Sequence, residues 1–119
     1  MDMESETTIL IVDDHQGFRR CARALLEADG FTVVGEADDG EGAISAIDSL
    51  RPDVVLLDVQ LPDMDGFAVL ARLDEGAPPV VLVSSRDASD YDDLIPGSGA
   101  RGFISKADLS GSVLRSLLP

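Results

Sequence analysis

Polar side chains with complementary chemistry follow the short apolar runs of this sequence. They are three carboxylates, one hydroxyl and one ammonium, namely Asp13, Asp14, Asp58, Ser84 and Lys106. Each stands at or just after the C-terminal end of a run of branched apolar residues. If these runs are parallel strands, their carboxyl ends meet at one edge of a sheet, where open α/β sheets place their ligands. We therefore expect the side chains to share one crevice.

The three carboxylates predict a metal site. Two ionised carboxylates about 4 Å apart repel each other by roughly 4 kcal/mol at an effective dielectric constant near 20. A hard divalent cation relieves this repulsion, and Mg²⁺ binds a few oxygen ligands while keeping several waters. Gln60 follows Asp58 closely, so its backbone carbonyl could add a further ligand. The predicted ligands of Mg²⁺ or Mn²⁺ are Asp13, Asp14, Asp58 and the backbone carbonyl of Gln60.

The same side chains predict phosphoryl transfer, which requires mainly positioning and neutralisation of charge. Lys106, the only lysine of the chain, could neutralise one phosphoryl oxygen, and the Ser84 hydroxyl could donate to another. A carboxylate can act as the nucleophile and form an acyl phosphate. Asp58 stands between the acidic pair and these two donors, so it is the expected acceptor.

Five short apolar runs predict strands, because each is too short for a helix of about ten residues and is bounded by turn residues. The expected strands are 7–12, 31–37, 54–59, 80–83 and 102–105. Amphipathic spacing predicts helices between them. The expected helices are 15–29, one between Gly40 and Pro52, 65–74, and a last helix that starts with Asp108 as its N-cap. The segment 87–99 contains Pro96, Gly97 and Gly99, which leave room for a helix of about two turns at most.

The alternation of strand and helix predicts an α/β fold with a parallel sheet and helices on both faces. The third strand is apolar throughout and belongs near the middle, whereas the second has mixed polarity and suits an edge. The expected architecture is a doubly wound, flavodoxin-like sheet of five strands in the order 2-1-3-4-5, with a short or irregular fourth helix.

Length and charge limit the class of protein. The 119 residues suffice for one domain with its own core, expected at 7–119 after a flexible acidic tail at 1–6. A net charge of −14 argues against binding of nucleic acid by this domain itself. No apolar run is long enough to span a membrane. The single cysteine, Cys21, fits a cytoplasmic location and is expected in the core of the first helix.

The order of these residues resembles the receiver domains of two-component response regulators. The likeness extends from Thr7 to Leu118 and is clearest in the segment Asp58-Val59-Gln60-Leu61-Pro62-Asp63-Met64-Asp65-Gly66. It includes the acidic pair, the hydroxyl and the lysine at the strand ends. The resemblance implies that a sensor histidine kinase, a phosphotransfer protein or a small phosphodonor transfers a phosphoryl group to Asp58.

The resemblance also implies an output. Ser84 and Phe103 would report phosphorylation by shifting the face made of the fourth helix, the fifth strand and the last helix. The pattern Gly99-Ala100-Arg101-Gly102-Phe103 is most similar to receivers that are joined to a C-terminal helix-turn-helix DNA-binding domain. The resemblance thus leaves open an effector domain, a stand-alone regulator and a homodimer.

Three features depart from the usual pattern of that family. Ala107 stands where many members have a proline after the lysine, so a trans peptide bond is expected. Phe103 replaces a tyrosine, so a relay through it would work by ring packing, without a hydroxyl. Pro96 and the nearby glycines shorten the helix that the family uses for output.

Two other functions are open to a sheet of this kind. A Mg²⁺-dependent phosphohydrolase would need a second catalytic acid two residues after its nucleophile, where this chain has Gln60. A flavodoxin-type cofactor binder would need a Ser-, Thr- and Gly-rich loop after the first strand, where this chain places acids that repel phosphate. We therefore expect a phospho-accepting signalling domain rather than an enzyme.

Single residues also admit simpler interpretations. His15 is expected only to open the first helix near the site. Ser85 could take the role assigned to Ser84, and Phe103 could be an ordinary core residue. The remaining acids of the segment before Pro96 form a solvated charge run, namely Asp90, Asp92 and Asp93.

Overall fold

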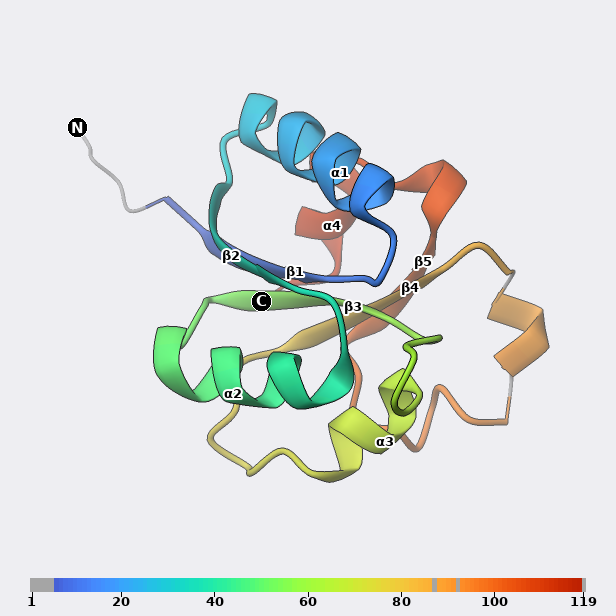
Figure 1. Ribbon diagram of the computed structural model, residues 1–119. Coiled ribbons are helices and arrows are strands. Elements are labelled where there is room, and N and C mark those ends of the chain that lie inside the picture. Colours follow the sequence, from blue (N-terminus) through green and yellow to red (C-terminus); the bar gives the residue numbers. More distant parts are fainter. Residues whose placement is uncertain (1–5, 87, 92, 119) are drawn as a thin grey trace.

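The computed structural model describes residues 6–86, 88–91 and 93–118 of the chain (Figure 1). Of the acidic tail expected at 1–6, only Glu6 lies within the described part. Asp87 and Asp92 also lie outside it, so the structure does not test the predictions that fall on them.

The sheet has five parallel strands in the order β2-β1-β3-β4-β5, as predicted. The strands are β1 (Thr8–Val12), β2 (Thr32–Ala37), β3 (Val54–Asp58), β4 (Val80–Ser84) and β5 (Gly102–Ser105). Every residue of β3 and β4 is buried, because helices or loops cover both of their faces. β2 forms one edge and is partly exposed. The predicted positions of the third and second strands are therefore confirmed.

Helices cover both faces of the sheet (Figure 1). They are α1 (Gln16–Ala28), α2 (Gly40–Leu50), α3 (Gly66–Ala71) and α4 (Gly111–Ser116), with the 3₁₀ turns η1 (Ala88–Tyr91) and η2 (Lys106–Asp108). On one face, Leu26 of α1 and Leu114 of α4 pack in one core cluster. On the other, Ala43 and Ile47 of α2 and Val69 of α3 pack in a second cluster. The doubly wound arrangement follows from burying an apolar stripe of each helix.

Side chains from the loop after β3 cap the starts of two helices. Asp65 is the N-cap of α3, and its Oδ1 accepts a hydrogen bond from the Ala68 N–H at 2.8 Å. Asp63 reaches α2 and accepts from the N–H groups of Gly40 at 2.7 Å and Glu41 at 3.0 Å. These two N–H groups hold the pKa of the Asp63 carboxyl below its ordinary value. The loop is thus tied to both helices on that face.

The turn into α3 passes very close to the end of β3. A Cβ atom on Gly66 would lie 2.8 Å from the Asp58 carbonyl oxygen and 3.1 Å from Val59 Cα. The Gly66 N–H donates to the Val59 carbonyl at 2.7 Å. Because only glycine permits this approach, the strand end and the helix start pack as one unit.

The last helix starts later than predicted. Asp108 is not its N-cap but the end of η2. Ser110 is the N-cap of α4, and its Oγ accepts from the Val113 N–H at 3.0 Å. Leu109 between them is extended and buried, so the chain must leave the turn before the helix can begin. No cis peptide bond occurs in the described residues, and the bond before Ala107 is trans as predicted.

Two further expectations are wrong. The third helix ends at Ala71 instead of near residue 74, because the chain tightens there and the Leu73 N–H donates to the Leu70 carbonyl at 3.1 Å. Cys21 is exposed rather than in the core, because Ala22 and Leu26 take the buried side of α1.

The connection from β4 to β5 contains no α-helix in its described residues. After η1, the N–H groups of Leu94 and Ile95 donate to the Tyr91 carbonyl at 2.8 and 3.1 Å. Gly99 has a φ of 87°, a left-handed backbone conformation that glycine adopts more readily than other residues because it has no Cβ atom. The predicted short or irregular fourth helix is therefore confirmed.

Candidate functional site

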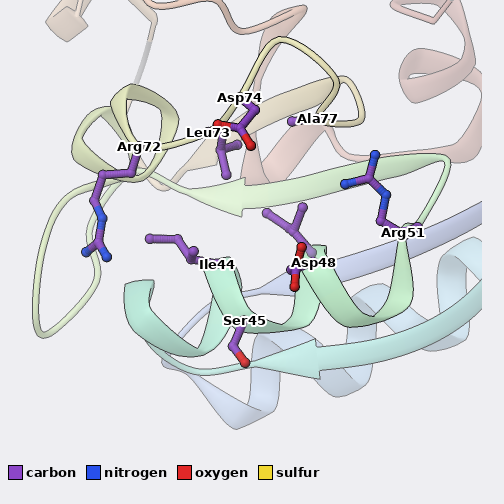
Figure 2. A pocket seen from close by; sticks show the side chains of 9 residues that line it. Ile44, Ser45, Asp48, Arg51, Arg72, Leu73, Asp74 and Ala77 are labelled. Carbon is purple, nitrogen blue, oxygen red and sulfur yellow. The ribbon is translucent and has the colours of Figure 1, made fainter.

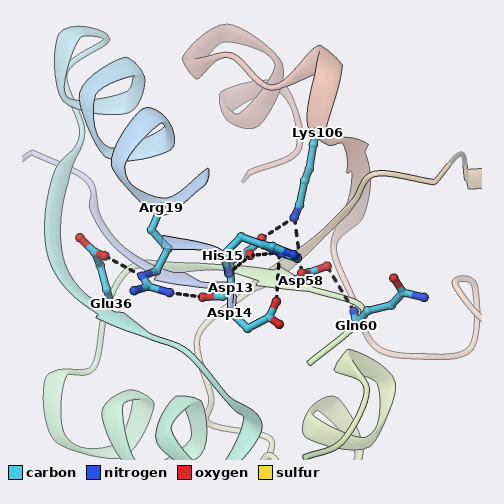
Figure 3. Close-up of polar contacts among 8 residues, drawn as sticks. All are labelled: Asp13, Asp14, His15, Arg19, Glu36, Asp58, Gln60 and Lys106. Atoms are coloured by element: carbon cyan, nitrogen blue, oxygen red, sulfur yellow. Dashed lines mark hydrogen bonds and ion pairs between the residues drawn. The ribbon is translucent and has the colours of Figure 1, made fainter. Parts of the chain in front are cut away.

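Three strands deliver ionisable side chains to one edge of the sheet (Figure 3). Asp13 follows β1 and is fully buried, and Asp58 is the last residue of β3 and is 3% exposed. Lys106 starts η2 directly after β5. Its Nζ lies 2.6 Å from Asp13 Oδ2 and 3.5 Å from Asp58 Oδ2. The structure therefore brings together charged residues that are far apart in the sequence.

Asp14 and His15 complete an acidic group beside these residues. One ligand atom from each of Asp13, Asp14, His15 and Asp58 lies within 4.8 Å of the others. The His15 Nδ1 is 3.1 Å from an oxygen of Asp13 and 3.1 Å from an oxygen of Asp14. His15 is the N-cap residue of α1, as expected, and its ring also bridges two acids, a contact that was not predicted from the sequence. Its side chain is 70% exposed, so the ring can move away without disturbing the core.

The Asp58 carboxyl has an unusual affinity for protons. Burial, followed by the negative charge of Asp13, raises the pKa of Asp58 to about 6. The Gln60 N–H, 3.2 Å from Asp58 Oδ1, and the Lys106 ammonium oppose this rise. A further cation beside Asp58 would favour its charged form.

The oxygens of the acidic group fit a hard divalent cation. Asp13 Oδ2 is buried and accepts no hydrogen bond from the described residues. The Lys106 ammonium lies 2.6 Å away as an ion pair, without the direction of a hydrogen bond. A buried carboxylate oxygen that accepts no hydrogen bond is suited to bind a metal ion, and Mg²⁺ and Mn²⁺ prefer oxygen donors. Gln60 adjoins Asp58 through its N–H, and a role for its carbonyl stays a prediction.

Two basic residues and one acid form a network beside Asp13 that was not predicted from the sequence; Figure 3 shows Arg19 and Glu36 of this network. The Arg19 guanidinium donates to the Asp13 carbonyl and to Glu36 Oε1, the latter at 2.9 Å. Arg23 donates to the other oxygen of Glu36 at 2.9 Å. Burial raises the pKa of Glu36, but the bonds from Arg23 and Arg19 outweigh it and the pKa is lowered. The only signal in the sequence for this contact was the presence of arginines, including Arg19 and Arg23, in the first helix.

Lys106 is also held by an aromatic ring. Its Nζ lies 4.5 Å from the centroid of Phe18 on α1, a distance at which a cation is attracted to the ring face. This contact and the two carboxylates confine the ammonium from different sides. This contact was not predicted from the sequence.

Ser84 ends β4 and is buried, and its predicted role toward a phosphoryl group stays a prediction. Its Oγ lies 3.2 Å from the Tyr91 hydroxyl and accepts from the Arg86 N–H at 3.0 Å. Among the described residues, no hydrogen bond joins Ser84 to Asp58. The serine is therefore near the strand ends without taking part in the charged group.

Phe103 on β5 belongs to a row of three aromatic rings. Tyr91 stands between Phe103 and Phe67, with centroid distances of 5.8 and 5.9 Å. The sequence pattern around Tyr91 predicted only a solvated run of acids, and no role was predicted for the tyrosine itself. A single aromatic residue among acids was the signal that could have identified it.

A pocket of 280 Å³ lies elsewhere, between α2 and the loop after α3 (Figure 2). Its polar lining includes Asp48 and Arg51 from the α2 side and Arg72 and Asp74 from the α3 side. These charges are balanced, and none of the candidate site residues lines the pocket. We therefore assign it no part in the site.

The chain is similar to many proteins of known class. Residues 9–115 match the family model described as response regulator receiver domain. The transcriptional regulatory protein CseB of Streptomyces avermitilis is 36% identical over 115 residues, which cover 94% of this chain and 47% of CseB. A protein-glutamate methylesterase/protein-glutamine glutaminase of Halalkalibacterium halodurans is 39% identical over 87% of this chain and 31% of its own length. The chain thus spans about half the length of the curated transcription regulators it matches, or less.

Solved structures agree with this similarity. The signal receiver domain of NarL from Mycobacterium tuberculosis has a TM-score of 0.82 and 35% identity, covering 96% of this chain and 98% of that one. A two-component response regulator of the LuxR family from an Aurantimonas species has a TM-score of 0.83 and 28% identity, covering 95% of this chain and 86% of that one. No helix in the described residues is both long and apolar enough to cross a membrane.

Proposed function

The chain belongs to the response regulator receiver domain family, and from this premise we propose that Asp58 accepts a phosphoryl group in a Mg²⁺-dependent reaction. The observation that carries the proposal is the setting of Asp58, an acid with a pKa of about 6 that lies between other acids and an ammonium. Such a carboxylate is positioned at a rigid strand end, and phosphoryl transfer requires positioning and charge neutralisation above all.

The proposed donor is the phosphohistidine of a sensor histidine kinase or of a phosphotransfer protein. A carboxylate oxygen of Asp58 bonds to phosphorus while the N–P bond breaks, and the imidazole nitrogen keeps the electron pair. The product is an acyl phosphate. Lys106, which is already 3.5 Å from Asp58 Oδ2, neutralises one of the phosphoryl oxygens.

Asp13, Asp14, Asp58 and the backbone carbonyl of Gln60 are the proposed ligands of Mg²⁺ or Mn²⁺. The buried oxygen of Asp13 that lacks a hydrogen bond supports this assignment. When bound, the cation would neutralise the acids and the oxygens of the phosphoryl group. The residues of this chain would then supply the remaining positioning, with Arg19 holding the Asp13 carbonyl.

We further propose that the receiver controls an effector domain that binds DNA. The name of CseB, a transcriptional regulatory protein, and the half-length coverage of such relatives support this. Another relative is a protein-glutamate methylesterase/protein-glutamine glutaminase, so receivers of this family also occur in proteins with other activities. The reaction would take place in the cytoplasm, and a stand-alone or homodimeric regulator is the alternative to a fused effector.

The proposal is tested by incubating the chain with phosphoramidate or acetyl phosphate and Mg²⁺, followed by intact mass spectrometry. We expect one base-labile phosphoryl group on the wild type and none on Asp58→Asn. Asp63→Asn is the matched control, because Asp63 lies in the same loop but bonds to the start of α2 instead of the charged group. Label that persists in Asp58→Asn would assign the acceptor to another residue.

The family assignment does not favour the phosphohydrolase alternative. The residue two positions after Asp58 is Gln60, whose N–H bonds to Asp58 but whose side chain is no acid. The same assay distinguishes the two functions, since a phosphohydrolase would release many phosphate ions per chain without retaining label. Uptake of one phosphoryl group that is lost slowly would agree with a signalling domain.

A further inference from the structure

The hydroxyls of Ser84 and Tyr91 form a pair beside the candidate site. Their oxygens lie 3.2 Å apart, and Ser84 is 1% exposed. The Arg86 N–H donates to the same serine oxygen at 3.0 Å. Within the described residues, these partners all follow β4 in the chain, and Asp58 is not among them. The segment after β4 therefore holds the Ser84 hydroxyl.

Aromatic packing fixes the tyrosine of this pair. The Tyr91 ring is tilted by 54° against Phe67 and by 47° against Phe103, at centroid distances typical of stabilising pairs. Phe103 has no hydroxyl, so it cannot exchange a hydrogen bond with Ser84. Tyr91, which is the only tyrosine of the chain, supplies that group from η1 instead.

A serine hydroxyl has one proton and can direct it to one acceptor at a time. Ser84 Oγ accepts from the Arg86 N–H, and either hydroxyl of the pair could donate to the other. Where Ser84 is the donor, its proton points to Tyr91, and a phosphoryl oxygen on Asp58 would compete for it. We infer that Tyr91 is a positioning residue that holds the Ser84 hydroxyl in the unphosphorylated receiver, and that phosphorylation of Asp58 breaks this pair. The inference rests on the proposed function, because it requires a phosphoryl group that competes for the serine proton.

Breaking the pair would act on the turn that follows η1. The Tyr91 carbonyl accepts the N–H groups of Leu94 and Ile95 at 2.8 and 3.1 Å, so a shift of Tyr91 moves this turn. Ile95 packs against the core cluster that contains β4 side chains, whereas Leu94 is 53% exposed. The turn thus connects the buried serine to the surface of the molecule.

Tyrosine emission tests whether the Ser84–Tyr91 pair exists and whether a phosphoryl analogue breaks it, because the chain has one tyrosine and no tryptophan. In the full chain, Mg²⁺ with beryllofluoride, a phosphoryl analogue, should change the emission of Tyr91. Ser84→Ala should produce a change in the same direction without either addition, because the partner of the hydroxyl is gone. Unchanged emission in Ser84→Ala would overturn the inference, since the pair would then be absent in solution.

The result with a phosphodonor separates this inference from the proposed function. If phosphoramidate labels Asp58 and the Tyr91 emission stays constant, the inference is overturned and the proposed function stands. If the wild type takes up no phosphoryl group, both are overturned. Labelling accompanied by the emission change supports both.

Tyr91→Phe tests whether the Tyr91 hydroxyl favours the unphosphorylated state, because this variant keeps the ring and removes only the hydroxyl. The bond is made only in the unphosphorylated state, so its loss should strengthen binding of beryllofluoride with Mg²⁺ by about fivefold, as measured by calorimetry. Ser98→Ala is the matched control. It removes a hydroxyl from the same connection, where Ser98 donates to the Ile95 carbonyl at 2.7 Å, and should leave the affinity unchanged.

Two outcomes would contradict this role of the Tyr91 hydroxyl. Equal or weaker binding by Tyr91→Phe would mean that the hydroxyl does not favour the unphosphorylated state. The same gain in Ser98→Ala would mean that general loosening of the connection is responsible, and not the pair of hydroxyls.

Discussion

One ammonium serves two buried or nearly buried carboxylates at the strand ends. Lys106 lies closer to Asp13 than to Asp58, at 2.6 against 3.5 Å. A single positive charge cannot neutralise these acids together with Asp14, so negative charge remains in excess near a region of low dielectric. Burial, followed by the charge of Asp13, raises the pKa of Asp58, and the excess of negative charge accounts for the fit of the site to a divalent cation.

The raised pKa of Asp58 predicts a pH dependence of stability in metal-free protein. The unfolded carboxyl loses its proton near pH 3.8 and the folded one near pH 6, so the folded state binds more protons between these values. Stability from this group is therefore present at low pH and is lost as the pH rises through about 6. After allowance for solvent screening, the loss is on the order of 2 kcal/mol.

Urea unfolding of wild type and Asp58→Asn in a chelator, from about pH 4 to 7, measures this effect. The asparagine variant cannot titrate at this position, so its advantage over the wild type should grow with pH. The difference between the two proteins removes the contribution of the carboxyls that do not interact with Asp58. Parallel curves would show that the Asp58 pKa is not raised.

Lys106→Ala should separate phosphoryl transfer from metal binding. Loss of a charge-assisted contact to a phosphoryl oxygen should slow labelling by phosphoramidate about tenfold or more. The response of the melting temperature to Mg²⁺ should persist, because Lys106 is not a proposed ligand. Arg101→Ala removes a positive charge from an exposed residue outside the charged group and should label like the wild type. Equal labelling rates for Lys106→Ala and wild type would remove the role of the lysine.

At the scale of elements, the turn η2 begins at Lys106 and ends before the last helix. Ser110 caps α4 through the Val113 N–H, and Asp29 of the α1 end accepts from the Gly111 N–H at 2.8 Å. The start of α4 is thus fixed by groups outside η2. The helix can pack against α1 while the turn orients Lys106 toward the strand ends.

Replacement of the N-cap residue Ser110 tests whether groups outside η2 fix the start of α4. Ser110→Ala should lower the free energy of unfolding by about 1 kcal/mol, because the N–H of Val113 loses its partner. Asp108→Ala should change it by less than about 0.5 kcal/mol, because Asp108 is exposed and does not cap the helix. Chemical denaturation of both variants gives the comparison. A larger effect for Asp108→Ala would restore the earlier start that the sequence pattern predicted.

At the scale of the whole molecule, a net charge of −14 makes any cation stabilising to some degree. A specific site must therefore be distinguished from general screening. Free Mg²⁺ at about ten times its dissociation constant should stabilise the fold by about 1.4 kcal/mol, which raises the melting temperature by a few degrees. Sodium chloride at equal ionic strength is the control for screening.

Asp13→Asn is the second control for this titration. It removes the charge of the buried candidate ligand and should abolish most of the Mg²⁺ effect, while the sodium effect stays. Metal-free Asp13→Asn should also melt at or above the wild-type temperature, because repulsion with Asp58 is relieved. An equal Mg²⁺ response in wild type and Asp13→Asn would locate the bound cation elsewhere.

The sequence by itself determined the strand order, the burial of the third strand and the position of the acids at the strand ends. Apolar runs and amphipathic spacing are local patterns, and the rules for parallel sheets turn them into a topology. The short fourth helix was predictable for the same reason, since Pro96 and nearby glycines act on their own backbone.

Only the tertiary structure decided which side chains pair. Lys106 after β5 meets Asp13 after β1, with β3 and β4 between them, and the Ser84 hydroxyl pairs with Tyr91. The late start of the last helix likewise depends on the burial of Leu109. Such choices depend on side-chain rotamers and on neighbours from distant segments, and each is decided by a few kcal/mol of burial, charge and hydrogen bonding that no local pattern contains.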